Sequence, residues 1–371
     1  MSSSFSQADR EFLKKAIQLA LRGRGFVSPN PLVGAVVVRE GEIVGTGCHR
    51  KFGGEHAEVE ALREAGHFAR HATLYCTLEP CSHFGKTPPC VNRIIEAGIK
   101  RVVLGSVDPN PLVNGRGIKV LRESNITVET GLLAEACREV NESFFKYITT
   151  RLPFVTLKIS QSVDGKIADQ NGQSRWISNE RSRRLTHRWR WQTDAVLVGI
   201  GTVLADDPRL TVRYEEGPQP RRIVLDSHLR IPLSAKLLND SHVERTAILV
   251  SHECKEHEKA GEIERRGAKI WRVPATLSGH LDLSQALERI GQEGVASLMV
   301  EGGRRIFTSF LEERLADRLT CFFAPIILGE GIPAFKGLEI SNISEAIHLI
   351  KPRWKILGDN GLVSGWIRYP K

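Results

Sequence analysis

Hydrophobic positions predict that helices and strands alternate through the first part of the chain. Between Gln7 and Arg24 apolar residues recur at helical spacing, and Ser6 is available as an N-cap. Leu32–Val38 is a short apolar run without alternation, as expected of a strand covered on both faces. The same reasoning predicts helices over 56–65, 91–97, 118–123 and 133–141 and strands over 73–77, 101–107 and 126–128. A sheet covered by helices is the simplest architecture.

The pattern restarts near residue 150, and the second half again alternates. A strand is predicted at Phe154–Ile159. Further strands near 194–199, 222–226, 246–250, 269–273 and 297–300 are separated by helical stretches such as 257–266 and 283–292. The segments 319–327 and 362–368 are strand-like with no helix pattern between them, which favours a mixed sheet. At 371 residues the chain is long enough for two domains, and we predict them at 1–149 and 150–371.

The composition is that of a soluble globular protein, with 41% hydrophobic and 26% charged residues. No apolar run approaches the roughly 20 residues that a membrane span needs, and residues 1–9 lack the features of a signal peptide. We therefore expect a cytoplasmic protein without a membrane partner. Seven cysteines, an odd number in a chain this large, favour reduced thiols, some of them metal ligands.

The net charge of +9 permits two kinds of partner. Basic residues are spread through Arg181–Arg184, Arg221–Arg222 and Arg304–Arg305 rather than gathered into one tract. A small phosphorylated substrate therefore explains the charge as well as nucleic acid does.

Four residues between Gly53 and Cys90 form a candidate zinc site with its own acid and base. His56, Cys81 and Cys90 supply the three ligands of a catalytic zinc, which keeps one position for water. Glu58 would move protons between that water and a leaving amine. His56 and Glu58 can share a site only in the first turn of a helix, and Gly53–Gly54 and Pro88–Pro89 each suit a helix start. The alternative is that the two cysteines are buried thiols and His56 is a surface histidine, as we expect core packing for Cys48, Cys76 and Cys137.

The His-x-Glu and Pro-Cys pieces are typical of zinc nucleobase deaminases, whose cysteines are spaced Cys-x-x-Cys. Here eight residues separate Cys81 from Cys90. This longer segment, with Pro29–Gly34 and Asp108–Pro111, resembles the deaminase domain of the bifunctional riboflavin-biosynthesis deaminase/reductase family. The resemblance implies a cytidine-deaminase-like three-layer domain, one zinc per chain, and hydrolysis of the 2-amino group of a phosphoribosylated diaminopyrimidinone. It further implies substrate contacts from Asn30, His49, His83, Lys86 and Asn110. From the residues alone, His83 could instead be a metal ligand and Lys86 a solvated loop residue.

The second half resembles the reductase domain of the same family. The resemblance rests on Leu157–Lys158, Ser162–Lys166, Ser174–Ile177, Gly201–Pro208 and Val300–Gly303, in the family's order. It implies a dihydrofolate-reductase-like α/β domain that uses NADPH to reduce the ribosyl group of the deaminated product. The implied NADPH residues are Ser160, Trp176, Thr202, Asp206, Ser227 and Gly303. The implied substrate residues are Lys158, Ser174, Arg190, Leu210, Arg213 and Glu301.

Two of these assignments also have a physical rationale. Gly302–Gly303 follows an apolar strand and precedes a helix pattern, so a phosphate could approach backbone N–H groups at the helix start. Two arginines suit a phosphate because the guanidinium offers paired donors and a fixed charge. The alternatives are a tight turn for the glycines, a solvated helix position for Arg190 and a core position for Trp176.

We predict a two-domain enzyme whose partner is a small phosphorylated pyrimidine rather than nucleic acid, and we expect a homo-oligomer. One alternative is a zinc deaminase of RNA or DNA, which the charge permits. A second alternative is a binding protein in which zinc is structural and His83 is the fourth ligand.

Overall fold

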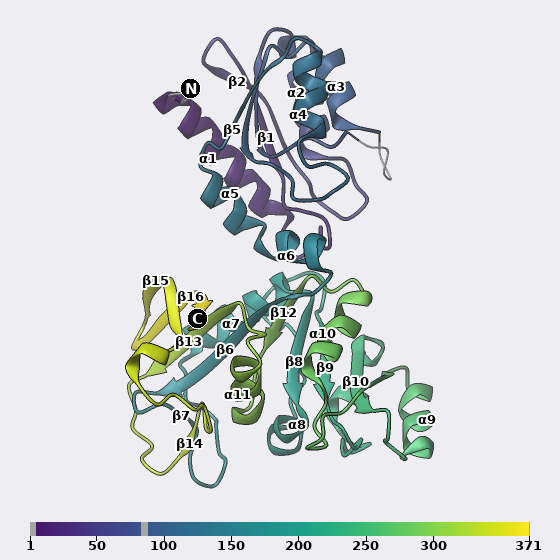
Figure 1. Cartoon of the computed structure of the whole chain (residues 1–371), viewed down its shortest axis with the longest axis vertical. Helices are drawn as coiled ribbons and strands as arrows, with labels where there is room; N and C mark the ends of the chain where they lie inside the picture. Colours follow the sequence, from purple (N-terminus) through teal and green to yellow (C-terminus); the bar gives the residue numbers. More distant parts are fainter. Residues whose placement is uncertain (1–4, 83–87, 371) are drawn as a thin grey trace. The chain divides into compact units, whose positions relative to one another are not determined.

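The computed structural model describes residues 5–82 and 88–370, which form two compact units, Met1–Arg151 and Leu152–Lys371 (Figure 1). The boundary predicted between residues 149 and 150 falls in the last helix of the first unit. That helix, α6 (Glu142–Thr150), was not predicted from the sequence. It begins after the buried Asn141, whose side chain bonds the backbone N–H and C=O of Leu32.

The first unit contains one five-stranded sheet and its helices. Its strands are β1 (Gly34–Arg39), β2 (Glu42–Cys48), β3 (Thr73–Leu78), β4 (Arg101–Ser106) and β5 (Thr127–Thr130). Its other helices are α1 (Gln7–Ala20), α2 (Ala57–Ala65), α3 (Cys90–Glu96), α4 (Arg116–Glu123) and α5 (Ala134–Val140), with short 3-10 turns at Leu21–Gly23 and Gly66–Ala69. The strand order is β2-β1-β3-β4-β5, antiparallel around β1 and parallel from β3 to β5.

Helices cover both faces of this sheet, so the predicted three-layer domain is confirmed. Ala35 and Val37 of β1 pack with α2, α3 and α4 on one face, whereas Val36 and Val38 pack with α1 and α5 on the other. Figure 1 shows the same division. The first helix is shorter than predicted, because the chain tightens into a 3-10 turn after Ala20.

Two glycines bring α2 unusually close to β2. A β-carbon on Gly47 would lie 2.1 Å from the carbonyl oxygen of Ala57, and one on Gly45 would lie 2.2 Å from that of Ala61. Only glycine therefore lets the helix backbone rest directly on the strand. This contact fixes the start of α2, where His56 and Glu58 lie.

The second unit is built on a nine-stranded sheet. The strands are β6 (Phe154–Ser162), β8 (Ala195–Gly199), β9 (Arg221–Leu225), β10 (Thr246–Ser251), β11 (Lys269–Val273), β12 (Ser297–Val300), β13 (Arg318–Ala324), β15 (His348–Leu357) and β16 (Asn360–Arg368). β7 (Lys166–Ala168) and β14 (Ile332–Pro333) form a separate pair. The helices are α7 (Glu180–Gln192), α8 (Ile200–Asp206), α9 (His257–Arg265), α10 (Leu283–Gln292) and α11 (Arg304–Glu312), with 3-10 turns at Lys236–Leu238, Val243–Arg245 and Ile343–Glu345.

The predicted mixed sheet is confirmed. Its order is β11-β10-β9-β8-β12-β6-β13-β16-β15, and the seven strands from β11 to β13 are parallel. β13–β16 and β16–β15 are antiparallel. One face packs on α10 and α11 and the other on α8 and α9, so the core lies in two layers. Helix α8 and strand β15 were not predicted from the sequence.

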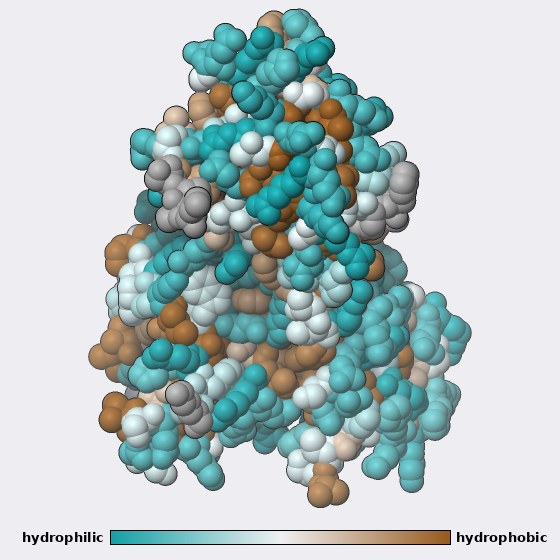
Figure 2. Space-filling model, turned by 45° about the horizontal axis from the view of Figure 1, so that its top comes forward, coloured by the Kyte–Doolittle hydropathy of each residue, from teal (hydrophilic) through white to brown (hydrophobic). Residues whose placement is uncertain are grey.

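The face of the molecule seen in Figure 2 is mainly hydrophilic, with apolar side chains gathered in a few places. Among the helices in the described ranges, none is both long and apolar enough to cross a bilayer.

Candidate active sites

Two helix starts bring the three predicted zinc ligands together. His56 is the N-cap of α2 but makes no capping bond with its side chain, and Cys90 is the first residue of α3. The His56 Nδ1 atom lies 3.1 Å from Cys90 Sγ and 3.5 Å from Cys81 Sγ. The three ligand atoms all lie within 4.8 Å of one another. This donor set and spacing fit a zinc ion, for which His and Cys are common ligands.

The electrostatics of this cluster favour a thiolate at Cys81. Hydrogen bonding from Cys90 lowers the pKa of Cys81, and the backbone N–H of Cys90, at the start of α3, lies 3.3 Å from its sulfur. The same contact raises the pKa of Cys90. The hydrogen bond with Cys81 raises the pKa of His56 to about 9. A sulfur that already carries negative charge is ready to bind a metal cation.

Glu58 is buried beside this cluster, in the first turn of α2. Only 3% of the residue is exposed, and burial raises the pKa of its carboxyl group. A carboxyl group with a raised pKa takes up and releases a proton closer to neutral pH, as a general acid and base must.

Glu79 ties the segment of Cys81 to the loop that carries Asn110. Its Oε1 atom accepts hydrogen bonds from the backbone N–H groups of Gly117 (3.0 Å) and Ile118 (3.3 Å). Its Oε2 atom accepts from those of Gly115 (2.9 Å) and Asp108 (3.3 Å). The residue is 4% exposed, so one buried carboxylate satisfies four backbone donors.

The residues that the resemblance assigns to the pyrimidine lie around this site only in part. Asn30 Nδ2 is 3.2 Å from His49 Nε2, and His49 Nδ1 is 2.8 Å from the carbonyl oxygen of Glu55. The rings of His49 and His56 meet edge to face at 5.5 Å. Burial lowers the pKa of His49, which favours its neutral imidazole. His83 and Lys86 lie outside the described residues, and their roles stay predictions.

The second unit holds a pocket of about 1610 Å³ at the carboxyl ends of its parallel strands. All twelve residues assigned to NADPH or substrate line it, namely Lys158, Ser160, Ser174, Trp176, Arg190, Thr202, Asp206, Leu210, Arg213, Ser227, Glu301 and Gly303. Glu301 directly follows β12, and Gly303 is the N-cap of α11. This is where an open α/β sheet usually binds its ligands.

The lining of this pocket is strongly cationic. It includes eleven Lys and Arg residues against five Asp and Glu residues. Most of the excess positive charge that the sequence spreads over many segments therefore comes together in one cavity. Several phosphate groups would be attracted to such a site.

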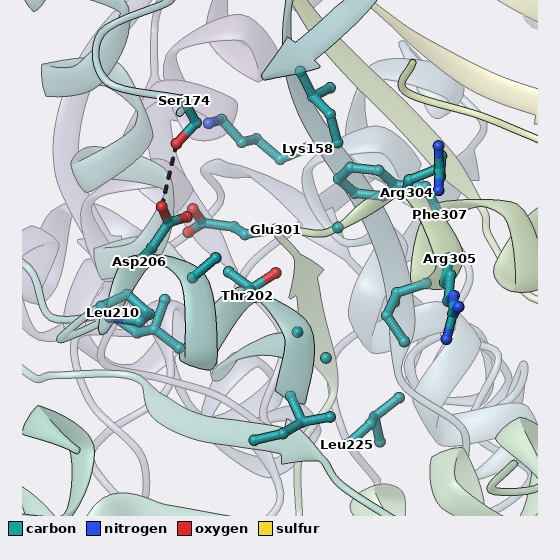
Figure 3. A pocket seen from close by; sticks show the side chains of 18 of the residues that line it. Lys158, Ser174, Thr202, Asp206, Leu210, Leu225, Glu301, Arg304, Arg305 and Phe307 are labelled. Atoms are coloured by element: carbon teal, nitrogen blue, oxygen red, sulfur yellow. Dashed lines mark hydrogen bonds between the residues drawn. The ribbon is translucent and has the colours of Figure 1, made fainter. Parts of the chain in front are cut away.

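Two polar groups in this pocket face each other closely. Glu301 makes a bidentate pair with Arg190, whose Nε and Nη2 atoms lie 2.5 and 2.8 Å from its two oxygens. This partner outweighs burial and holds the pKa of Glu301 at about 2. Burial lowers the pKa of Lys158, which Glu301 partly offsets. Figure 3 shows Lys158, Glu301, Ser174 and Asp206 in one part of the pocket, with a Ser174–Asp206 hydrogen bond of 3.3 Å, and Arg304 and Arg305 in another.

Helix α7 contributes two further residues to this pocket that were not predicted from the sequence. Arg183 and His187 line the pocket together with Arg190. Their spacing of four and three residues places all three on one face of a helix, which is the signal that could have found them.

Comparisons with known proteins agree with both halves of this description. Residues 6–106 match the family model of the cytidine and deoxycytidylate deaminase zinc-binding region, and residues 153–360 match that of the RibD C-terminal domain. The chain is 46% identical to the riboflavin biosynthesis protein RibD of Aquifex aeolicus, over 98% of this chain and 99% of the relative. It is 38% identical to that of Escherichia coli, over 89% and 92%.

Solved structures give the same result over the full length. The Acinetobacter baumannii RibD structure superposes with a TM-score of 0.87 at 33% identity, covering 98% of this chain and 99% of the other. A Thermotoga maritima structure described as a diaminohydroxyphosphoribosylaminopyrimidine deaminase/5-amino-6-(5-phosphoribosylamino)uracil reductase gives 0.83 at 36% identity, with the same coverage.

These matches define an enzyme that joins a zinc-dependent pyrimidine deaminase to a reductase. The chain belongs to the RibD family of riboflavin-biosynthesis proteins. It is a bifunctional hydrolase and oxidoreductase whose cofactors are zinc in the deaminase domain and NADPH in the reductase domain.

Proposed function

We propose that the first unit hydrolyses the 2-amino group of 2,5-diamino-6-(5-phosphoribosylamino)pyrimidin-4-one, and that the second unit reduces the ribosyl group of the product to ribityl. The observation that carries the first step is the convergence of His56, Cys81 and Cys90 beside the buried Glu58. The naming of the substrate is supported by the full-length similarity to the Thermotoga maritima structure.

In the deaminase unit, His56, Cys81 and Cys90 hold the zinc. When bound, zinc makes hydroxide available from water near neutral pH. Glu58 takes the proton from the attacking water and delivers it to the amine that leaves as ammonia. The raised pKa of Glu58 suits both transfers, because the protonated and ionised forms are then closer in free energy.

The pyrimidine is oriented by His49, Asn30 and Asn110. Because the His49 Nδ1 atom donates to the Glu55 carbonyl oxygen, its Nε2 atom accepts from the Asn30 amide, which fixes the direction of that amide. Asn110 is assigned to the pyrimidine from the resemblance, and it lies in the loop whose Asp108 and Gly115 N–H groups bond to Glu79. His83 and Lys86 are proposed from the resemblance to contact the base or the ribosyl phosphate.

In the reductase unit, the start of α11 would hold a phosphate of NADPH, because Gly303 is the N-cap there and Gly302 has a φ of +126°. Ser160, Trp176, Thr202, Asp206 and Ser227 line the remaining cofactor site. NADPH supplies the hydride. Lys158, whose pKa is lowered by burial, holds a proton for the opening sugar, and Ser174, Leu210 and Glu301 position the ribosyl chain.

The test is to incubate the full chain with the diaminopyrimidinone substrate and to follow ammonia release and NADPH oxidation separately. We expect Glu58→Gln to lower ammonia release by about 10²- to 10⁴-fold, because general acid–base catalysis contributes about that much. Glu55→Gln is the matched control, since Glu55 also adjoins His56 but its side chain is 54% exposed. If Glu58→Gln retains zinc and deaminates at the normal rate, Glu58 is not the proton carrier.

NADPH oxidation with the deaminated product should be unchanged in both variants. Ammonia release without any NADPH oxidation in the wild type would leave the deaminase proposal standing and would contradict the reductase proposal.

We also propose that the chain forms a homo-oligomer through β15. This strand is at the edge of the nine-stranded sheet, and its Trp354 and Ile356 side chains are 69% and 79% exposed. Two large apolar side chains that are exposed on an edge strand are suited to an interface. Light scattering on a Trp354→Glu/Ile356→Glu variant should show a smaller species than the wild type.

We propose a cytoplasmic setting, which seven free thiols support because disulfides form in oxidising compartments. We further propose that nucleic acid is not a partner. The cationic pocket accounts for most of the net charge.

A further inference from the structure

The two arginines that the resemblance assigns to the substrate are held by different kinds of partner. Arg190 is bound by the carboxylate of Glu301 through two parallel hydrogen bonds. Arg213 is bound by the imidazole of His187, whose Nε2 atom lies 3.0 Å from Arg213 Nη2 and 3.3 Å from Arg213 Nε. One partner is an anion and the other is a ring that can be neutral.

His187 is neutral at physiological pH. It is 3% exposed, and burial together with the cations of Arg190 and Arg213 lowers its pKa to about 4, with Glu301 acting in the opposite direction. Its ring also meets the edge of the Tyr214 ring at 4.9 Å. A neutral imidazole can accept a hydrogen bond at Nε2 when its proton is on Nδ1, which is the form that the Arg213 donors require.

The difference in partner decides how much positive charge each arginine keeps. Glu301 cancels the charge of Arg190, and the two side chains are 13% and 9% exposed. His187 orients Arg213 without cancelling its charge, and Arg213 is exposed in the wall of the pocket. An arginine that keeps its full charge and has further N–H donors directed to solvent is suited to a dianionic phosphate.

The positions of the two pairs in the chain explain their proximity. His187 and Arg190 are three residues apart on α7 and face the same pocket. Arg213 comes from the segment that follows α8, and the Arg190 Nη1 atom bonds the carbonyl oxygen of Thr211 in that segment at 3.1 Å. Helix α7 therefore holds this segment at two points.

We propose that His187 is a positioning residue that holds Arg213 as the ligand of the substrate phosphate, and that Arg190 acts on the substrate through Glu301 instead. This inference rests on the proposed function of the reductase unit. It separates the roles of two arginines that the resemblance treats alike.

The test is steady-state kinetics of NADPH oxidation by the full chain with 5-amino-6-(5-phosphoribosylamino)uracil. His187→Leu removes the acceptor and should raise the KM for this substrate by about tenfold, because hydrogen bonds to charged groups contribute about 1.5–3 kcal/mol. The kcat and the affinity for NADPH should change by less than about twofold, since neither depends on the phosphate contact once substrate is bound. His187→Gln keeps a neutral acceptor, so its KM should be close to that of the wild type.

A double-mutant cycle shows whether His187 acts through Arg213. If it does, His187→Leu should add nothing to the KM of Arg213→Ala. Independent effects that multiply in the double variant, or an unchanged KM in His187→Leu, would overturn the proposal.

Inorganic phosphate separates this inference from the proposed function. It should compete with the substrate in the wild type and bind about tenfold more weakly to His187→Leu, as isothermal titration can measure even without turnover. Equal binding of inorganic phosphate to both proteins would refute the role of His187. A wild type that binds phosphate but oxidises no NADPH would refute the proposed function alone. Thermal unfolding of each variant shows whether weaker phosphate binding or a higher KM results from a less stable fold. If His187→Leu is unstable, the KM and phosphate affinity of His187→Gln test the proposal instead.

Discussion

The zinc site and the reductase pocket are assembled in different ways. The zinc ligands lie within 35 residues of sequence, from His56 to Cys90, and their ligand atoms meet within 4.8 Å. The reductase pocket draws its lining from Lys158 to Lys336 and encloses about 1610 Å³. The first site is small and consists of a few buried groups. The second is a wide cavity in which the binding free energy is the sum of many weak contacts. We therefore expect single changes to be far more damaging in the first than in the second.

Removal of zinc tests this contrast most severely. Treatment with a chelator should abolish ammonia release completely and leave NADPH oxidation with the deaminated substrate within about twofold, because only the first unit has a catalytic use for the metal. Zinc added back in stoichiometric amount should restore deamination. A parallel loss of NADPH oxidation would show that the two sites are not independent.

The next largest effect is expected from Glu79→Gln. An amide would place N–H donors against the backbone N–H groups of the loop before α4 and of its first turn, so the segment of Cys81 and the loop of Asn110 would both shift. Residues that support metal ligands typically contribute about 10- to 100-fold to metal affinity or activity. Zinc affinity by chelator competition and the deamination rate should both fall by such a factor.

Glu129→Gln is the matched control for that variant. Glu129 forms a partly buried ion pair with Arg101 in the first unit, at 2.6 Å, and lies on β5 rather than beside a zinc ligand in the sequence. It should lower the unfolding midpoint without changing zinc affinity. Equal zinc affinities in the two variants would contradict the role of Glu79.

Acid should weaken the reductase unit through His187. The pKa of His187 is lowered from 6.5 to about 4 in the folded chain, so between these values only the unfolded chain binds the proton. The stabilisation is fully present above pH 6.5 and is lost as the pH falls to 4, by up to about 3 kcal/mol. All six tryptophans lie in the second unit, so urea unfolding followed by tryptophan fluorescence reports on that unit. His187→Gln should lose less stability than the wild type over this pH range; equal losses would refute this explanation.

The smallest effect is expected from Trp176→Ala. Trp176 is 65% exposed in the pocket wall, and the Arg183 guanidinium lies 4.4 Å above its ring. One exposed stacking contact contributes about 1–2 kcal/mol, so the Kd for NADPH should rise about five- to thirtyfold without loss of kcat. Trp354→Ala, at an equally exposed tryptophan outside the pocket, should leave the Kd unchanged. A several-hundredfold loss of NADPH affinity in Trp176→Ala would mean that the pocket is as sensitive to a single substitution as the zinc site.

The zinc site was predictable because its signals are short-range. Gly53–Gly54 and Pro88–Pro89 mark the two helix starts, and the structure places His56 and Cys90 at them. The same locality made the two-domain α/β architecture and the mixed sheet predictable, since apolar runs reflect burial in either half.

The remaining features depend on contacts between distant segments. In the sequence Glu79 looks like an ordinary acidic residue; the fold brings to it two backbone N–H groups of a later loop and two of the first turn of α4. His187 gains its role from Arg213, 26 residues further on in a segment without regular structure. Strand β15 escaped prediction because most of its residues are exposed and show no apolar pattern. Contacts between residues that are far apart in the sequence cannot be predicted from the local spacing of apolar residues.

The contact between β2 and α2 has a consequence for protein engineering. Because a side chain at residue 45 or 47 would collide with the backbone of α2, these two glycines set the position of the helix and therefore of Glu58. Libraries aimed at new pyrimidine substrates should therefore leave these glycines untouched and vary the loops that carry Asn30 and Asn110. In such libraries the loops can diversify while the acid–base group stays fixed.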